Sequence, residues 1–343
     1  MMKALAKFGR PSDFGTYRMI DIPEPECGDN DIILEVKAAA ICGADMKHYK
    51  VDNGSDEFGS VRGHEFAGEI VRVGKNVKDW RPGQRIVSDN TGHVCGRCPA
   101  CERGDYLSLF MRRSSIWGLG YGYSGGFTKY CRIPGEILAI HKRAIWEIPE
   151  GLEYEEAAVM DPICNAYKAI AQRSGLLPGE NVVIFGTGPL GLFSVQIAKI
   201  MGALNIVVVG LEEDVKVRFG VARQLGATEV VNGSAEDVVK RCQEICGGSD
   251  SIGLVVDCAG ANICLKQAIE MVRCNGEIVR VGMGFKPVGF SINDISMKAV
   301  SIIGHMAYDA TSWRNSLQLL AAAGFRLTHD YAPAGPLQVG GRV

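Results

Sequence analysis

Residues 182–191 read Val-Val-Ile-Phe-Gly-Thr-Gly-Pro-Leu-Gly, and the apolar stretch 192–201 that follows has a helical pattern. GxGxxG is a weak signal by itself, because a chain with 43 glycines in 343 residues produces chance matches. Here it lies between a β-branched run and a helix, where glycines permit a tight turn and the helix N-terminus attracts phosphates. We predict a dinucleotide site at Gly186, Gly188, Pro189, Leu190 and Gly191. The alternative is a glycine-rich turn without a ligand.

Short apolar runs, each followed by a helical stretch, recur through the C-terminal half of the chain. They are Val182–Phe185, Ile206–Val209, Glu229–Val231, Leu254–Asp257, Ile278–Val281 and Val300–Ile303. Such runs indicate a parallel sheet that is buried on both faces. Residues 1–150 instead contain short β-prone segments between Gly- and Pro-rich turns, which is typical of a small antiparallel barrel. The predicted fold class is α/β, with an antiparallel β-barrel followed by a doubly wound parallel sheet.

An acidic cluster follows the second predicted strand of this sheet. In NAD-binding folds a carboxylate about 20 residues after the glycines accepts the ribose hydroxyls. Gly210 occupies the position where this carboxylate is expected, and Glu212, Glu213 and Asp214 follow it. We therefore predict that Glu212 and Glu213 bind the coenzyme. Carboxylates repel a 2′-phosphate, so the cluster favours NAD over NADP, although Arg218 could reverse this preference. The alternative is a solvated acidic turn.

Four candidate metal ligands are spread along the chain: Cys42, His64, Glu65 and Asp161. A thiolate, an imidazole and carboxylates suit tetrahedral zinc with one position open for water or substrate. Each residue is weak evidence by itself, since a lone histidine is more often a core or surface residue. Sequence separation does not show that the four converge.

A second cysteine group has regular spacing. Cys95, Cys98 and Cys101 place three thiols within seven residues, which indicates a zinc-binding lobe. A structural tetrahedral site requires a fourth ligand.

Charge and hydropathy exclude several classes of function. The chain has 37 Lys and Arg against 39 Asp and Glu, so no basic surface for nucleic acid is expected. The charge-free window 181–198 is interrupted by glycines and a proline, so no membrane span is expected. No apolar leader is seen at the N-terminus, which predicts a cytoplasmic protein with reduced cysteines.

Taken together, these motifs resemble the zinc-containing medium-chain dehydrogenase/reductase superfamily, in its sorbitol, threonine and polyol dehydrogenase branch. The order Cys-Gly-x-Asp, Gly-His-Glu, Cys triplet, Asp-Pro and GxGxxG covers nearly the whole chain. The resemblance implies a GroES-like catalytic domain at residues 1–152 and 293–343, and a Rossmann coenzyme domain at residues 153–292. It also implies catalytic zinc at Cys42, His64, Glu65 and Asp161, and a homotetramer or homodimer.

Three features depart from the family pattern. Leu109 stands where relatives carry the fourth cysteine of the structural zinc lobe, so Asp105 or another ligand would have to replace it. Ala44 replaces the usual Ser or Thr of the proton relay, which leaves water, His48, Lys47 or Glu65 to release the substrate proton. The Trp-containing segment usual after Pro336-Leu337 is missing, which predicts a shortened C-terminal part.

The expected function is hydride transfer from a secondary alcohol, such as a polyol, sugar or cyclitol, to NAD. One alternative is an amino-alcohol dehydrogenase similar to the threonine enzyme. Another is a truncated nucleotide-binding relic with little activity. A zinc-free enone or quinone reductase is disfavoured, because it would not require Cys42, His64 and Glu65.

Overall fold

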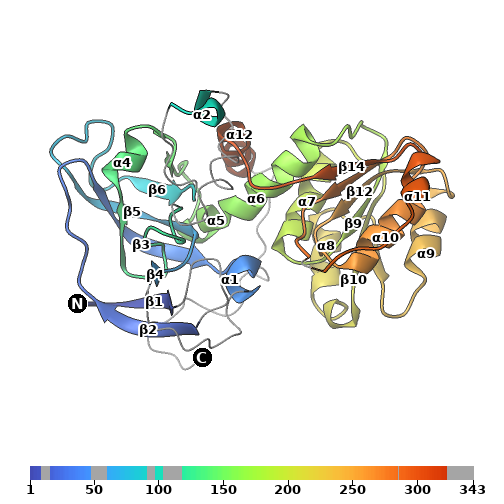
Figure 1. Ribbon diagram of the computed structural model, residues 1–343, viewed down its shortest axis with the longest axis horizontal. Helices are drawn as coiled ribbons and strands as arrows, with labels where there is room; N and C mark the ends of the chain where they lie inside the picture. The colour runs from blue at the N-terminus through green and yellow to red at the C-terminus, as the bar shows by residue number, and fades with distance from the viewer. Residues whose placement is uncertain (9–15, 48–59, 91–96, 103–117, 285, 323–343) are drawn as a thin grey trace. The chain divides into compact units, whose positions relative to one another are not determined.

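The computed structural model describes the chain except residues 9–15, 48–59, 91–96, 103–117, 285 and 323–343 (Figure 1). The described chain divides into two compact units. The first contains the described residues up to Asp161, and the second contains those from Pro162 onwards.

The first unit is built from two antiparallel sheets. A three-stranded sheet has the order β2-β1-β4, and a five-stranded sheet has the order β7-β3-β5-β6-β8. The strands are β1 (Met2–Phe8), β2 (Thr16–Ile22), β3 (Ile32–Ala40), β4 (Ser60–Val61), β5 (Glu65–Val73), β6 (Arg85–Ser88), β7 (Tyr130–Ile133) and β8 (Ile145–Glu147). The helices are α1 (Gly43–Lys47), α2 (Pro99–Glu102), α4 (Gly135–Leu138), α5 (Tyr154–Ala158) and α6 (Met160–Tyr167), the last of which continues into the second unit.

The larger sheet packs on a buried apolar core. Ile32, Leu34, Phe66 and Ile70 belong to one fully buried cluster that strands β3 and β5 share. The two strands approach closely at Gly68, where a Cβ atom would lie 2.1 Å from the Glu35 carbonyl oxygen. The ladder between β3 and β5 is antiparallel, as predicted for this part of the chain.

The second unit is a six-stranded sheet of the order β11-β10-β9-β12-β13-β14, in which every pairing is parallel. The strands are β9 (Asn181–Phe185), β10 (Ile206–Gly210), β11 (Glu229–Asn232), β12 (Ile252–Asp257), β13 (Glu277–Arg280) and β14 (Ser301–Gly304). The helices are α7 (Pro189–Ile200), α8 (Arg218–Leu225), α9 (Val238–Cys246), α10 (Asn262–Met271), α11 (Ile292–Ser296) and α12 (Ala310–Ala321). A π-helical turn at Lys168–Gln172 follows α6, and a 3₁₀ turn at Glu212–Asp214 follows β10.

Helices cover both faces of the parallel sheet (Figure 1). Val183 and Phe185 of β9 share a core cluster with residues of α9 and α10. Because successive strand residues point to opposite faces, Val182 and Ile184 point to the other face, which α7 covers. The predicted doubly wound sheet is therefore confirmed.

The boundary expected for the second unit differs from the one observed. Residues 293–343 were expected to belong with the barrel, but β14 pairs in register with β13 and adds a sixth strand to the parallel sheet. Helix α12 also contacts the second unit, where the Asn315 side chain donates to the Tyr167 hydroxyl at 2.8 Å. The described part of this segment, up to residue 322, therefore belongs to the second unit, while residues 323–343 lie outside the described chain.

Among the described residues, no helix combines the length and the apolar character needed to span a bilayer.

Candidate metal centre and coenzyme site

Three of the four candidate metal ligands come together in the first unit. One ligand atom from each of Cys42, His64 and Glu65 can be chosen so that all three lie within 4.8 Å of one another. The pairing of β3 with β5 explains this convergence, because Ala40 at the end of β3 pairs with Glu65 at the start of β5. Cys42 lies two residues beyond Ala40, and His64 immediately precedes Glu65.

The His64 imidazole is held by its surroundings and is only 2% exposed. Its Nδ1 atom lies 3.7 Å from the Asp45 carboxylate, and its ring stacks on Tyr121 with centroids 4.8 Å apart. The Tyr121 hydroxyl lies 3.4 Å from Nε2. Burial, aided by the Arg62 charge, lowers the pKa of His64 to about 3. The imidazole is therefore neutral at physiological pH, which is the form that binds metals.

The Cys42 thiol and the Glu65 carboxyl are buried close to other acidic groups, which disfavours their charged forms. Burial raises the pKa of the Cys42 thiol, and Glu65 and Asp161 raise it further. Burial also raises the pKa of the Glu65 carboxyl, with added repulsion from Asp161 and Asp45. A divalent cation would relieve this repulsion and stabilise the deprotonated forms. The donor set of thiolate, imidazole and carboxylate fits zinc.

Asp161 lies beside this cluster, in the first turn of α6. Its carboxylate accepts a hydrogen bond of 2.7 Å from the Asn90 side chain. It is not one of the three residues that lie within mutual ligand distance among the described residues, although its charge acts on both Cys42 and Glu65.

Sequence reasoning missed the residues that support His64. Arg62 is 1% exposed, and its guanidinium carbon lies 4.9 Å from the centre of the Tyr121 ring. Gly63 has a φ of +90°, and Gly126 donates to its carbonyl oxygen at 2.7 Å, which fixes the 61–64 segment against the glycine-rich loop that carries Tyr121. The Cys-Gly-x-Asp motif contained a signal for Asp45, but nothing in the sequence pointed to Arg62, Tyr121 or Asn90.

Several predicted residues lie outside the described chain. They are His48, Cys95, Asp105 and Leu109, and the side chain of Lys47 is not described either. In the described part of the cysteine lobe, Cys98 immediately precedes α2 and Cys101 lies within it. Their sulfur atoms are 3.6 Å apart.

The glycine-rich turn of the second unit joins β9 to α7 as predicted. Gly186 has a φ of +102°, which favours glycine. A Cβ atom at Gly191 would lie 2.0 Å from the Gly186 carbonyl oxygen, whereas one at Gly188 would meet no atom within 4 Å. Helix α7 starts at Pro189 with Gly188 as its N-cap, so the first-turn N–H groups are available to phosphate oxygens.

The acidic cluster after β10 is arranged differently from the expectation. A Cβ atom at Gly210 would lie 2.5 Å from Phe219 and 2.9 Å from the Asp214 carboxylate, so there is no room for an acid at position 210. Asp214 is buried, accepts a hydrogen bond from the Leu211 N–H at 2.9 Å and lies 3.3 Å from Arg218. Glu212 accepts a hydrogen bond of 2.6 Å from the Asn232 side chain, and Glu213 is exposed.

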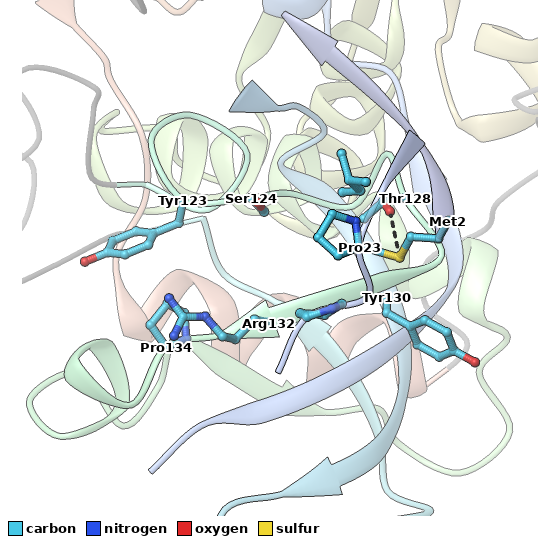
Figure 2. A pocket seen from close by; sticks show the side chains of 10 residues that line it. Met2, Pro23, Tyr123, Ser124, Thr128, Tyr130, Arg132 and Pro134 are labelled. Carbon is cyan, nitrogen blue, oxygen red and sulfur yellow. Dashed lines mark hydrogen bonds between the residues drawn. The ribbon is translucent and has the colours of Figure 1, made fainter. Parts of the chain in front are cut away.

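A pocket of about 140 Å³ in the first unit is separate from these candidate ligands (Figure 2). Its lining includes Tyr123, Arg132 and Thr128 but none of the candidate ligands. These three side chains have partners within the first unit, including the contact between Thr128 and the Met2 sulfur that Figure 2 shows.

Residues 28–143 match the alcohol dehydrogenase GroES-like domain family, and residues 189–322 match the zinc-binding dehydrogenase family. The chain is 66% identical over 331 residues to the zinc-type alcohol dehydrogenase-like protein YdjL of Escherichia coli K12, covering 95% of this chain and 90% of the relative. The chain belongs to the zinc-type alcohol dehydrogenase family. This confirms the resemblance to zinc-containing medium-chain dehydrogenases and the GroES-like and Rossmann folds.

More distant relatives of this dehydrogenase act on different alcohols. It is 31% identical to the sorbitol dehydrogenase of Halalkalibacterium halodurans, covering 96% of this chain and 92% of the relative. It is 29% identical to the L-threonine 3-dehydrogenase of Photorhabdus laumondii, covering 95% and 91%. A protein of Sinorhizobium meliloti 1021, named as a zinc-binding dehydrogenase and solved with NADP, has a TM-score of 0.77 at 27% identity, covering 95% and 90%. The dehydrogenase is therefore an oxidoreductase of a zinc- and NAD(P)-dependent family that acts on small molecules.

Proposed function

We propose that this dehydrogenase oxidises a secondary alcohol of a polyol, sugar or cyclitol and transfers the hydride to NAD. The observation that carries the proposal is that ligand atoms of Cys42, His64 and Glu65 lie within 4.8 Å of one another. The His64 imidazole among them is neutral and can therefore bind a metal. Similarity to a sorbitol dehydrogenase and a D-arabitol-phosphate dehydrogenase, which match 96% and 98% of this chain, supports a polyhydroxylated substrate. An L-threonine 3-dehydrogenase reaches the same 31% identity as the sorbitol enzyme, over 88% of this chain, so an amino alcohol is the second candidate.

In this proposal the first unit supplies the groups that act on the alcohol. Cys42, His64 and Glu65, with Asp161 beside them, would hold a zinc ion that acts as a Lewis acid and lowers the pKa of the alcohol. The Asp45 carboxylate lies 3.7 Å from His64 Nδ1, and the Asn90 side chain orients Asp161 through a hydrogen bond. Such supporting contacts fix the direction in which a ligand's lone pair points.

The second unit binds the coenzyme. The α7 N-terminus and the backbone at Gly186 and Gly188 would bind the pyrophosphate of NAD, which would supply the hydride acceptor. We favour NAD over NADP because Asp214, Glu212 and Glu213 surround the end of β10, while Arg218 is already paired with Asp214. The cation that would accept a 2′-phosphate is therefore neutralised.

The substrate proton leaves through water, Lys47, His48 or Glu65, and single substitutions at these three residues discriminate among the routes. Ala44, which has no side-chain hydroxyl, lies in α1 and cannot relay it.

We also propose a cytoplasmic homo-oligomer, either a tetramer or a dimer. All described cysteines are free thiols, in keeping with a reducing compartment. Strand β14 is at the end of the described sheet, so its outer edge is a candidate for pairing with a second copy. A structural zinc at Cys95, Cys98 and Cys101 remains part of the proposal only if another ligand replaces Leu109.

A substrate panel tests this function. Purified protein is mixed with NAD or NADP and with sorbitol, other polyols, cyclitols, L-threonine and simple secondary alcohols, and NADH or NADPH formation is followed at 340 nm. We expect polyols or cyclitols with NAD to give the highest kcat/KM. A higher kcat/KM with L-threonine would overturn the substrate class, and coenzyme binding without any turnover would favour a nucleotide-binding relic.

A further inference from the structure

A buried ion pair joins the ends of two neighbouring strands in the second unit. Asp257 is the last residue of β12, and Arg280, the last residue of β13, pairs with it across the parallel ladder. The Arg280 Nη1 atom donates to Asp257 Oδ2 at 2.5 Å, and the two side chains are 18% and 0% exposed. The function proposed above does not use either residue.

The pair holds the loop that follows β12. The other Asp257 oxygen accepts hydrogen bonds from the backbone N–H groups of Ala259, at 3.1 Å, and Gly260, at 2.8 Å. The Arg280 Nη2 atom donates to the Gly260 carbonyl oxygen at 2.8 Å. The N–H and the C=O of Gly260 are therefore both held by the same ion pair.

The loop after β13 is fixed against the first loop. The N–H of Gly282 donates to the Asp257 carbonyl oxygen at 2.7 Å. A Cβ atom at Gly282 would lie 2.3 Å from the Gly260 nitrogen, and one at Gly284 would lie 2.3 Å from the Gly260 carbonyl oxygen. Backbone packs directly on backbone here, so a small shift of Gly260 would displace both loops.

The loop that follows β12 lies next to the glycine-rich coenzyme turn. Strand β12 is the neighbour of β9, and a Cβ atom at Gly186 would lie 3.3 Å from the Ala259 nitrogen. The Cys258 N–H donates to the Phe185 carbonyl oxygen at 3.0 Å. In doubly wound sheets the dinucleotide crosses the carboxyl ends of the strands, with one nucleotide on each side of the central strand.

The residues that follow the neighbouring strands show which half of the coenzyme would lie on each side of β9. The acidic residues that suit the adenosine ribose follow β10, on one side of β9. Strands β12 and β13 lie on the other side, so their loops face the nicotinamide half of the coenzyme.

Stability alone does not account for this ion pair. Two buried charges gain little over two apolar side chains of similar size, because both must be removed from water. The ion pair instead holds the backbone of residues 258–260 and 282–284 in one conformation.

We infer that Asp257 and Arg280 are positioning residues that fix these two loops for the nicotinamide half of the coenzyme. The inference rests on the coenzyme site of the proposed function. The pair touches neither reacting group and acts through the backbone of Gly260 and Gly282.

Arg280→Lys tests the inference, because lysine keeps the charge but cannot bond Asp257 and the Gly260 carbonyl in the same way. Dissociation constants are measured by fluorescence titration or calorimetry for NADH and for ADP-ribose, which has the adenosine half without nicotinamide. We expect the NADH constant to rise about tenfold or more and the ADP-ribose constant to change less than about twofold. NADPH replaces NADH if the wild type binds it more tightly.

Arg273→Lys is the matched control. Arg273 pairs with Glu180 at 2.7 Å, is 34% exposed, and lies at the amino ends of the same strands. We expect this variant to lower the unfolding temperature without changing the ratio of the two dissociation constants. Gly284→Ala, which disturbs the Gly260 carbonyl from the other loop, is expected to reproduce the selective loss of NADH binding and provides a second test if Arg280→Lys does not fold.

An equal weakening of NADH and ADP-ribose binding in Arg280→Lys and Gly284→Ala would overturn the inference, and so would unchanged binding of both. Failure of the wild-type protein to bind any dinucleotide would instead reject the coenzyme site itself, so the two failures are distinguishable.

Discussion

Ala40 and Glu65 pair across β3 and β5, and this one register brings Cys42 to His64 although 21 residues separate them in the chain. Glu65 is the first residue of β5 and lies at the end of the ladder. Cys42 and His64 lie just outside the two strands, beside this end. The antiparallel pairing of the first unit is thus what builds the proposed metal centre.

Tyr121 is expected to support metal binding through its ring and not through its hydroxyl. Tyr121→Leu removes the surface on which His64 stacks, and loss of such supporting contacts typically weakens metal affinity by about 10- to 100-fold. Tyr121→Phe keeps the ring and should bind zinc within about threefold of wild type. Zinc affinity is measured by competition with a chromophoric chelator. Equal affinities for the leucine and phenylalanine variants would contradict this role.

Asp214 is expected to govern the choice between NAD and NADP. Asp214→Asn removes the charge beside Gly210 and frees Arg218, so a 2′-phosphate becomes easier to accommodate. We expect the ratio of kcat/KM for NAD to that for NADP to fall at least about tenfold. Glu244→Gln, on the exposed surface of α9, is the control and should leave the ratio unchanged. The account of coenzyme choice fails if Asp214→Asn keeps the wild-type preference.

His305 should make the protein less stable in acid. Burial, together with the Lys168 and Arg173 charges, lowers its pKa to about 4, whereas in the unfolded chain histidine titrates near 6.5. Between these values the unfolded chain binds more protons, so the free energy of unfolding decreases as pH falls. The expected loss between pH 7 and pH 5 is about 2 kcal/mol from this residue.

His305→Gln has no such titration and should show a flatter pH dependence over this range. Urea unfolding at pH 7 and pH 5 measures the difference between the two proteins, under conditions where each unfolds reversibly. Identical slopes for wild type and variant would show that His305 does not contribute.

The sequence predicted the second unit better than the metal centre. Buried parallel strands are continuous apolar runs, and the glycine turn has a local signature, so both are visible in short windows such as 182–191. Convergence of Cys42, His64 and Glu65 depends on long-range strand register, which no short window contains. Tyr121 was missed for the same reason, since its contacts with Arg62 and His64 join segments that are far apart in the sequence.

Three further differences depend on contacts between elements that the sequence alone does not show. Because Gly210 has no side chain, the sequence predicted that Glu212 and Glu213 bind the coenzyme, and only packing shows that the Asp214 carboxylate reaches the space beside Gly210. Asp257 and Arg280 are ordinary strand-end residues in the sequence, and their pairing depends on the order of strands in the sheet. The segment 293–322 was expected with the barrel because the resemblance suggested it, although the apolar run Val300–Ile303 indicated the sixth parallel strand that is observed.

Zinc content and turnover, measured together on wild type, Cys42→Ser and Cys274→Ser, test the central claim most directly. Cys274 is an exposed free thiol in the second unit and serves as the matched control. We predict about one zinc per wild-type chain, or two if the cysteine lobe also binds, with the same content in Cys274→Ser. Cys42→Ser should lose one zinc and at least about 100-fold in kcat/KM for the best alcohol. Full turnover in a Cys42→Ser protein that binds no metal would contradict the account.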